Sequence, residues 1–430
     1  MLFIPPAIQQ PAPAPVTVTL DLAAALARAR ADNPNLLAAK AKVQERQGLI
    51  TSVRADALPQ ITLVNDFTRI RDVSILNSGF GELANQFGFA PADLVGARNI
   101  YTSQANLNQP LFYWGKIGTA LRIARMGEVE ARYGFTTAEL EVLHGVAKAY
   151  LNVLATQADL EVVATRQQTA ERFLEDVKNK LEAQTATELD RLRAESELLG
   201  VVPETLQTEA NHQRALEVLN SQLGLDPRTP LALRDLGAAD TAALPAERGE
   251  RSEIAQLKQQ EEMYRANDTV IKSDLRPKLD LGLSYGYQAG STSNLYKAPY
   301  DTWRVGVTLK WPVFDGLRTS GKRSQNNAQL EQLRQVRIDR ERTVAVEKST
   351  ATREVTKAVA LDRAARKAYA ASLEALRMSR ESFEQGLITS LDLLQAERSE
   401  RQMESQRRHA ELGLWSALFD YRRALGLPPL

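Results

Sequence analysis

Four segments of the chain alternate between apolar and polar residues, which is the period of a β-strand with two different faces. The pattern is clearest in residues 278–288 and 302–311, where leucine, valine, tyrosine or tryptophan fills every second position. It is weaker in residues 61–68 and 101–108. Alternating segments of about ten residues with aromatic ends are typical of outer-membrane strands, but a sheet over a soluble core has the same period. We predict four strands, and the pattern alone leaves both settings open.

On the membrane interpretation, each strand turns its apolar side toward lipid. The residues predicted to face lipid are Leu281, Leu283, Val305 and Val307. Asp280, Arg304 and Lys310 fall on the opposite side and are expected to face water. Four strands are too few to close a barrel, for which eight is about the minimum, so several chains would have to contribute to one barrel.

Residues 19–57, 116–223 and 317–425 read as helical stretches. The Asn33-Pro34 step is expected to break the first stretch, and Leu58-Pro59 to end it. If residues 317–384 form one helix, it is about 100 Å long, whereas globular helices average about 11 residues. Such a rod needs lateral partners along its whole length. The wide apolar stripes of residues 140–160 predict packing between two neighbours, and alanine-rich faces permit close coiled-coil contacts.

One passage occurs twice at a constant shift of 202 residues. The pattern Thr-x-Leu-Asp-x-Leu-x-Ala-Glu of residues 187–195 returns at residues 389–397, and the same shift relates Pro110 to Pro312. Upstream the shift is 218, so the first copy has 16 extra residues before Pro110, which should form a loop. We predict two copies of one structural unit, residues 18–238 and 251–430, each with a helix, two strands and a long helical hairpin. Residues 239–250 would link the copies, and residues 1–17 would form a proline-rich tether.

The turn of each hairpin is predicted to lie just before the repeated passage. Gly386 is placed to end the second long helix, because glycine readily adopts the left-handed conformation at a helix C-terminus. Thr389 or Ser390 can then cap the returning helix. Gln184 occupies the glycine position in the first copy, so we expect that turn to be made differently.

Composition narrows the classes of function. The net charge of +1 over 430 residues gives no sign of nucleic-acid binding, which usually needs a basic patch. The absence of cysteine excludes disulfides, thiolate metal sites and a lipid-modified N-terminal cysteine. No run of 18 apolar residues predicts a spanning helix. No signal peptide is visible, because Met1-Leu-Phe-Ile is too short for its apolar core, so either a signal has been removed or the protein stays inside the cell.

Two motifs are imperfect matches to catalytic or binding sites. Residues 316–322 nearly spell a phosphate-binding loop, but Arg323 stands where the magnesium-binding serine or threonine belongs, so we interpret this segment as a strand-to-helix turn. His144, His212 and His409 are scattered over helical stretches without metal-ligand spacing and are expected to be exposed or packed helix residues. No catalytic constellation can be nominated. The sequence therefore predicts no enzyme, no cofactor site and no metal site.

The order of these elements resembles that of the TolC-like outer-membrane efflux proteins, also called outer membrane factors, and the resemblance covers nearly the whole chain. The quoted residues that carry it are Thr19-Leu20 to Asn33-Pro34, Leu58-Pro59, Gln109-Pro110-Leu111-Phe112, Trp311-Pro312-Val313-Phe314-Asp315-Gly316, residues 383–392, and the closing Leu425-Gly426-Leu427. Each is weak alone. Their duplication in the same order makes the resemblance specific.

The resemblance implies a mainly α fold of long antiparallel coiled-coil helices that form a trimeric α-barrel across the periplasm. Four β-strands from each chain of the homotrimer would complete a 12-stranded transmembrane β-barrel among the lipids of the outer membrane of a Gram-negative bacterium. The hairpin tips would meet a periplasmic adaptor, or membrane fusion protein, that links the duct to an inner-membrane transporter. Matched by position, the adaptor-contact residues are Gln184, Thr185, Ala186 and Thr187, with Gly386, Leu387, Ile388 and Thr389.

The family closes its periplasmic mouth with aspartate rings and polar links between helices. Asp392 matches a ring aspartate, and Asp190 matches a linking aspartate. This chain departs from the family pattern at three gate positions: Gln395 replaces a second ring aspartate, Phe383 a linking tyrosine and Ile388 a linking arginine. Asp392 has an equally good interpretation as a carboxylate at the positive end of a helix dipole.

Three functional hypotheses follow. The first is a passive outer-membrane exit duct for small molecules, fed by an adaptor and an inner-membrane pump. The second, from the same family, is a type I secretion duct for polypeptides, which the tip residues do not distinguish from the first. The third is a cytosolic coiled-coil scaffold, favoured only if the gene start lacks an export signal.

Overall fold

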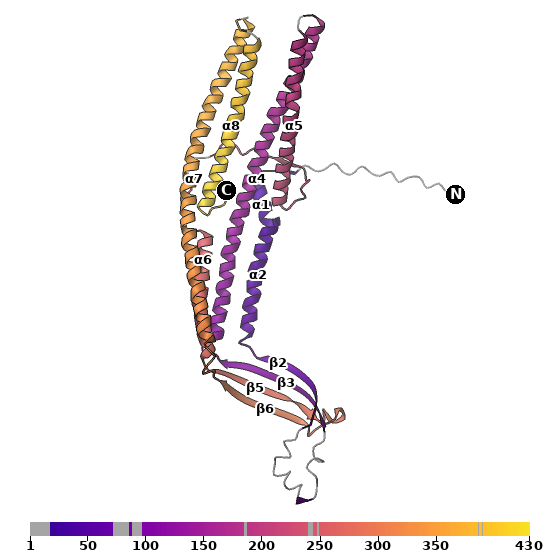
Figure 1. Ribbon diagram of the computed structural model, residues 1–430, viewed down its shortest axis with the longest axis vertical. Coiled ribbons are helices and arrows are strands. Elements are labelled where there is room, and N and C mark those ends of the chain that lie inside the picture. Colours follow the sequence, from indigo (N-terminus) through magenta and orange to yellow (C-terminus); the bar gives the residue numbers. More distant parts are fainter. Residues whose placement is uncertain are drawn as a thin grey trace, which may run out of the picture. The chain divides into compact units, whose positions relative to one another are not determined.

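The computed structural model describes residues 18–71, 86–87, 97–184, 187–239, 244–246, 249–385, 387–388 and 390–430, and Figure 1 labels its elements. The predicted N-terminal tether lies outside the described residues, as does most of the predicted loop insertion. Residues 71–97 separate the first two long strands and residues 290–300 separate the last two, so the 16 extra residues of the first copy fall between its strands.

The first half of the chain contains β1 (Val18–Leu20), α1 (Leu22–Asp32), α2 (Pro34–Ala55), β2 (Gln60–Ile70), β3 (Arg98–Phe112), α4 (Lys116–Glu182), α5 (Glu188–Gln222) and β4 (Leu231–Leu233). The second half contains α6 (Ser252–Lys272), the 3-10 turn η3 (Ser273–Leu275), β5 (Lys278–Ala289), the 3-10 turn η4 (Thr292–Asn294), β6 (Asp301–Lys310), α7 (Arg318–Glu384) and α8 (Ser390–Ala424). The chain is thus mainly helical with some strands, as predicted.

Corresponding helices in the two halves have equal lengths. Both α4 and α7 have 67 residues, and both α5 and α8 have 35. Their first residues differ by the 202-residue shift of the sequence pattern, and α2 and α6 begin 218 residues apart. The element boundaries therefore follow the same two shifts as the sequence.

The first predicted helix begins later than expected, because Thr19 and Leu20 lie in β1, which pairs in parallel with β4. The side chain of Asp21 then caps α1 by accepting a hydrogen bond from the Ala24 N–H at 2.7 Å. The predicted break at Asn33-Pro34 is confirmed, since α1 ends at Asp32 and α2 begins at Pro34. A three-residue strand is too short to show a period in sequence, which explains the error.

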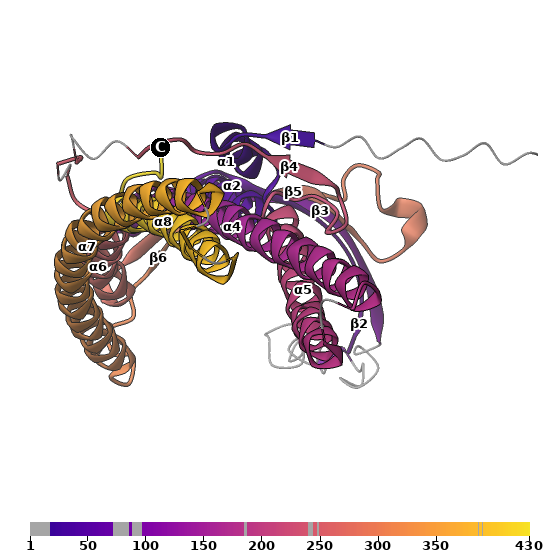
Figure 2. The same ribbon diagram turned by 90° about the horizontal axis from the view of Figure 1, so that it is seen from above.

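The chain divides into two compact units. The hairpin unit comprises residues 1–42, 131–256 and 337–430, and the sheet unit comprises residues 43–130 and 257–336. In the hairpin unit α4 packs on α5, and α7 packs on α8, as Figure 2 shows. The main core of this unit gathers side chains from α1, α4, α5 and α8, among them Leu26, Leu143, Tyr150, Leu219 and Phe419.

The buried Tyr150 ties the two short strands to this core. Its hydroxyl lies 2.6 Å from the carbonyl oxygen of Arg234, just after β4, and 3.1 Å from that of Leu20 in β1. The N–H of Arg234 in turn donates to the hydroxyl at 3.1 Å. Because a buried polar group needs partners, this position selects tyrosine over phenylalanine.

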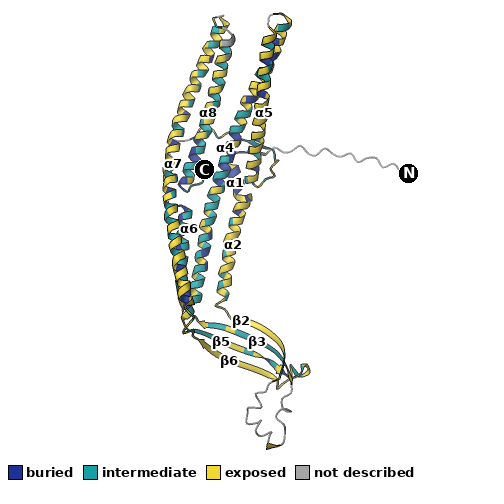
Figure 3. Ribbon diagram, viewed as in Figure 1, coloured by how far each residue is buried: buried dark blue, intermediate teal, exposed yellow. Residues whose placement is uncertain are grey.

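The sheet unit holds four antiparallel strands in the order β2-β3-β5-β6. Residues opposite each other in an antiparallel pair point to the same face. The register pairs Ile61 with Leu107, Leu107 with Leu283, and Leu283 with Val305, so all four strands place apolar residues on one face. In Figure 3, β2 and β6 are coloured almost entirely as exposed.

Candidate functional site

The residues expected to carry function lie at the hairpin ends and in the sheet, and the contacts between the two hairpins are described with them. In the turn between α4 and α5, Gln184 has a φ of +57°. This left-handed conformation is one that glycine adopts readily; Gly386, the residue with which the two turns would be compared, lies outside the described residues. Glutamine pays a conformational cost there that glycine would not.

The return into α5 is fixed by a reciprocal cap. The Asp190 N–H donates to Thr187 Oγ1 at 3.3 Å, and the Thr187 N–H donates to Asp190 Oδ2 at 3.0 Å. Thr187 Oγ1 also lies 2.6 Å from Asp190 Oδ2. The hydrogen bond from the Thr187 hydroxyl is the main cause that lowers the pKa of Asp190, and the bond from the Thr187 N–H lowers it further. Asp190, predicted to link neighbouring helices, therefore binds its own helix start in this chain.

The second hairpin end is partly described. The Leu387 N–H donates to the Ser382 carbonyl at 2.9 Å, a bond five residues back that is typical of a helix C-terminus. Leu387 is 72% exposed and Ile388 is half-buried. Of the predicted adaptor-contact residues, Thr185, Ala186, Gly386 and Thr389 lie outside the described residues.

Two of the predicted gate residues, Asp392 and Gln395, lie on exposed helix surface, whereas Asp190 is half-buried. Asp392 is in the first turn of α8, at the position that Asp190 has in α5. Gln395 follows one turn later, and both side chains are exposed. Phe383, near the end of α7, is 41% exposed. The helix-start interpretation of Asp392 agrees with this place, where the helix dipole favours a negative charge.

A row of charged contacts joins α8 to the first hairpin within the hairpin unit. His144 Nε2 on α4 lies 2.7 Å from Asp420 Oδ1 on α8, and Lys148 Nζ lies 3.0 Å from Asp420 Oδ2. His409 Nε2 on α8 lies 2.7 Å from Asp159 Oδ1 on α4. We call these two histidine–aspartate pairs the interhelical clamps.

Asp420 contacts both a histidine and a lysine, and these contacts change its pKa. Burial alone would raise its pKa, but hydrogen bonds from His144 and Lys148 outweigh burial and lower the pKa. The third histidine, His212 on α5, lies 3.1 Å from Thr156 Oγ1 on α4, and burial lowers its pKa. All three histidines are helix residues, as predicted. The aspartate partners of His144 and His409 were missed, because they lie 276 and 250 residues away in sequence.

The four residues predicted to face lipid share the apolar face of the sheet, where Leu281 pairs with Val307 and Leu283 with Val305. Leu283, Val305 and Val307 are 40%, 56% and 60% exposed, although Leu281 is half-buried. Asp280, Arg304 and Lys310 lie on the other face. These exposed apolar side chains lie on adjacent strands and form one continuous apolar face.

The turns from strand to helix have unusual backbone geometry. Trp114 and Gly115 before α4 have φ values of +49° and +75°, and Gly316 and Leu317 before α7 have +66° and +67°. The near-match to a phosphate-binding loop is therefore confirmed as a strand-to-helix turn. Lys322 Nζ is paired with Asp274 Oδ2 at 3.2 Å, so its charge is partly neutralised within the chain.

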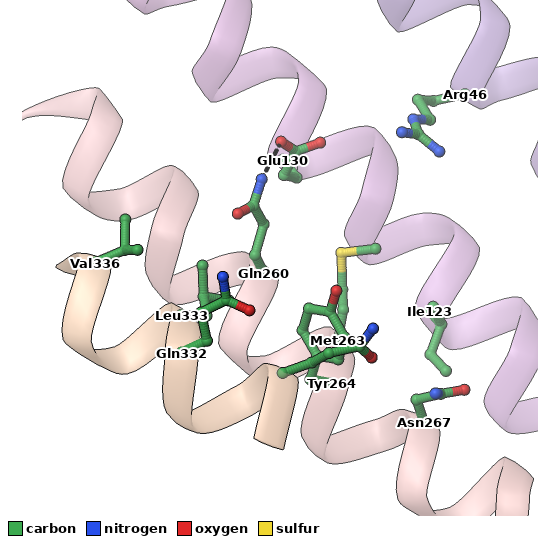
Figure 4. A pocket seen from close by; sticks show the side chains of 11 residues that line it. Arg46, Ile123, Glu130, Gln260, Met263, Tyr264, Asn267, Gln332, Leu333 and Val336 are labelled. Carbon is green, nitrogen blue, oxygen red and sulfur yellow. Dashed lines mark hydrogen bonds between the residues drawn. The ribbon is translucent and has the colours of Figure 1, made fainter. Parts of the chain in front are cut away.

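A pocket of about 560 Å³ lies between α2, α4, α6 and α7 in the sheet unit (Figure 4). Gln260 Nε2 donates a hydrogen bond to Glu130 Oε1 at 2.8 Å across the pocket lining. Amides and apolar side chains, including Met263 and Leu333, form most of the remaining lining. In the described part of the chain, no group of three histidine or acidic side chains could hold a metal ion.

None of the helices in the described residues is both long enough and apolar enough to cross a membrane.

Comparison with known proteins matches residues 25–225 and 244–427 to the family described as outer membrane efflux protein. The chain is 23% identical over 409 residues to the outer membrane protein TolC of Vibrio cholerae, covering 92% of this chain and 88% of that protein. It is 25% identical over 312 residues to the pyoverdine export outer membrane protein OpmQ of Pseudomonas aeruginosa, covering 70% of this chain and 63% of that protein, less than two thirds. The crystal structure of the CmeC outer membrane channel of Campylobacter jejuni has the same fold, with a TM-score of 0.78 at 15% identity, over 94% of this chain and 85% of that one.

Proposed function

Because this chain belongs to the outer membrane efflux protein family, we propose that it forms the exit duct of a tripartite efflux system in the outer membrane of a Gram-negative bacterium. The duct passively conducts small molecules that an inner-membrane transporter and a periplasmic adaptor deliver to it. The observation that carries this proposal is the four-stranded sheet with an exposed apolar face. Membership of an outer-membrane protein family excludes the hypothesis of a cytosolic scaffold.

The proposed assembly is a homotrimer. In the described sheet, β2 and β6 are the outer strands, and open strand edges are not tolerated in lipid. Pairing β6 of one copy with β2 of the next satisfies both edges. Each neighbouring pair in the sheet is antiparallel, so β2 and β6 run in opposite directions and their pairing is antiparallel too. Three copies then close a 12-stranded barrel, whose polar faces line the lumen.

The sequence halves act as two structural repeats in this proposal, residues 18–238 and 251–430, joined by the linker 239–250. Equal helix lengths and the constant 202-residue shift support it. Helical hairpins from three copies continue the barrel as an α-helical tunnel. Gln184 to Thr187 and Gly386 to Thr389, at the hairpin ends, contact the periplasmic adaptor.

The mouth of the tunnel is formed by three copies of Asp392. Like charges that converge in a narrow ring repel one another and attract cations. Gln395 stands where relatives place a second aspartate, so the ring holds a divalent cation less tightly than two stacked rings would. Asp190, the second gate aspartate, is held at the start of α5 by its cap with Thr187.

Mass measurement in detergent combined with single-channel recording tests the proposal. We expect a species of three times 47.6 kDa that produces steady currents in planar bilayers. A folded monomer without channel activity would contradict both the trimer and the duct. In a deletion strain, restored resistance to small toxic molecules supports efflux, whereas restored secretion of a polypeptide without any change in resistance supports the type I secretion alternative.

A further inference from the structure

An aromatic pair and a cation lie together where the sheet ends at α4. Phe112 pairs in register with Leu279, whose side chain is on the apolar face. The ring of Trp114 meets that of Phe112 edge-on, with centroids 5.1 Å apart. The guanidinium carbon of Arg276 lies 5.2 Å from the centroid of the Trp114 ring. We call Phe112, Trp114 and Arg276 the Trp114 cluster.

Trp114 occupies a left-handed position that both strand-to-helix turns share, since Gly115, Gly316 and Leu317 are left-handed too. Its φ of +49° is rare for a bulky residue. At the equivalent place in the second turn, 202 residues later, Gly316 adopts a φ of +66° without such a cost. The Trp114 side chain is 43% exposed, so its ring is accessible from outside the sheet unit's core. The turn therefore holds a large aromatic ring at the end of the sheet, at a position where glycine would fit the backbone at lower cost.

The surroundings of the cluster carry excess positive charge. Three lysines share one carboxylate, that of Asp274. The distances from Nζ to a carboxylate oxygen are 2.6 Å for Lys116, 3.2 Å for Lys322 and 3.9 Å for Lys278. Arg276 follows Asp274 by two residues and is exposed. Within the described residues, Arg276 forms no ion pair with a carboxylate, and its guanidinium stacks on the Trp114 ring. A guanidinium in this state retains all its donors for an external anion.

We propose that the Trp114 cluster binds the phosphate headgroup of an anionic phospholipid in the inner leaflet of the outer membrane. The inference rests on the proposed lipid-facing orientation of the sheet. Tryptophan prefers the interface between hydrocarbon and water, and basic side chains near that interface attract anionic headgroups. Phe112 and Trp114 then lie beside the acyl chains and glycerol, while Arg276 donates to the phosphate oxygens.

Quenching of Trp114 fluorescence by brominated lipid tests this site. The chain has four tryptophans, so Trp303, Trp311 and Trp415 are replaced by phenylalanine to leave Trp114 as the sole reporter. The full-length trimer is reconstituted in phosphatidylcholine vesicles that contain either brominated phosphatidylglycerol or brominated phosphatidylcholine. At equal content of brominated lipid, we expect brominated phosphatidylglycerol to quench Trp114 more strongly than brominated phosphatidylcholine. Equal quenching by the two lipids would overturn the proposal.

Arg276→Gln should lower the preference for phosphatidylglycerol roughly fivefold, the contribution of one basic side chain near an anionic surface. The matched control is Arg304→Gln, on the polar face of β6, which should keep the preference. An unchanged preference in Arg276→Gln overturns the proposal. If that variant does not insert, salt is the second measurement: raising it from ~0.1 M to ~1 M should weaken the preference of the unsubstituted reporter. A salt-independent preference counts against the site.

The duct and the lipid site fail in different ways. A trimer that conducts in pure phosphatidylcholine but shows no preference for phosphatidylglycerol removes only the lipid site. A protein that neither forms a trimer nor inserts in any lipid removes the proposed function itself.

Discussion

Asp420 on α8 accepts contacts from both His144 and Lys148 on α4, at 2.7 and 3.0 Å, and so joins the two hairpins within the hairpin unit. The carboxylate is 44% exposed, so its ion pairs are screened by water and stabilise the protein modestly. Its lowered pKa nevertheless makes the contact sensitive to acid.

The first prediction concerns pH. Because the pKa of Asp420 is lowered in the folded state, its stabilisation is present above the unfolded pKa of about 4 and is lost as pH falls through the folded value. Asp420→Asn should cost about 1 kcal/mol near pH 7, and the difference from the unsubstituted protein should shrink in acid. Thermal unfolding followed across pH provides the measurement. A difference that grows in acid would contradict this reasoning.

The second prediction concerns the two faces of the sheet. Val305→Arg should cost roughly 2–4 kcal/mol of folding in a bilayer, because it places a charge on the proposed lipid face. Thr308→Arg lies on the opposite face, where it pairs with Asp280 in register, and should cost much less. Refolding of each variant into vesicles at graded denaturant compares the two. Equal costs would mean that the two faces do not differ in environment.

The third prediction concerns the mouth of the duct. Asp392→Ala should weaken block of single-channel current by divalent cations, because the proposed ring loses its charge. Asp190→Ala should leave conductance almost unchanged, since that carboxylate is held by Thr187. It should instead speed hydrogen exchange in the first turn of α5. Cation block that survives Asp392→Ala would leave this residue as a helix-start carboxylate only.

The fourth prediction concerns the tie between the core and the short strands. Tyr150→Phe removes a buried hydroxyl that lies 2.6 Å from the Arg234 carbonyl. The loss should lower stability by about 1–3 kcal/mol, because the backbone groups of Arg234 lose a partner. Chemical denaturation with trimer mass as the readout measures the effect. Thr156→Val, which removes a part-buried contact with His212, should cost less.

The sequence was most informative where a period repeats many times. Long helices and the β5 and β6 strands follow from spacing over ten or more residues, and their boundaries obey the shift seen in the sequence. The pair β1 and β4 was missed because three residues carry no period and their pairing spans 213 positions in register. The left-handed Gln184 was missed because propensity favours glycine there, and the surrounding turn overrides it.

Only part of the candidate site could likewise be predicted from the sequence. The cap of Thr187 and Asp190 could have been found, because a capping residue followed three positions later by an acid is a known helix-start signature. The interhelical clamps and the contact of Arg276 with Trp114 could not, since they join residues that only the packed chain brings together.

The equal lengths of α4 and α7, and of α5 and α8, restrict how this protein can change during evolution. One residue inserted into one helix of a hairpin moves the rest of that helix by about 1.5 Å along the other helix. It also rotates every later side chain of the lengthened helix by roughly 100°. An insertion or deletion in one helix of a hairpin is therefore tolerated only with a matching change in the other helix. Both hairpins must change by the same number of residues to keep equal lengths. Multiples of seven residues would preserve the packing stripes.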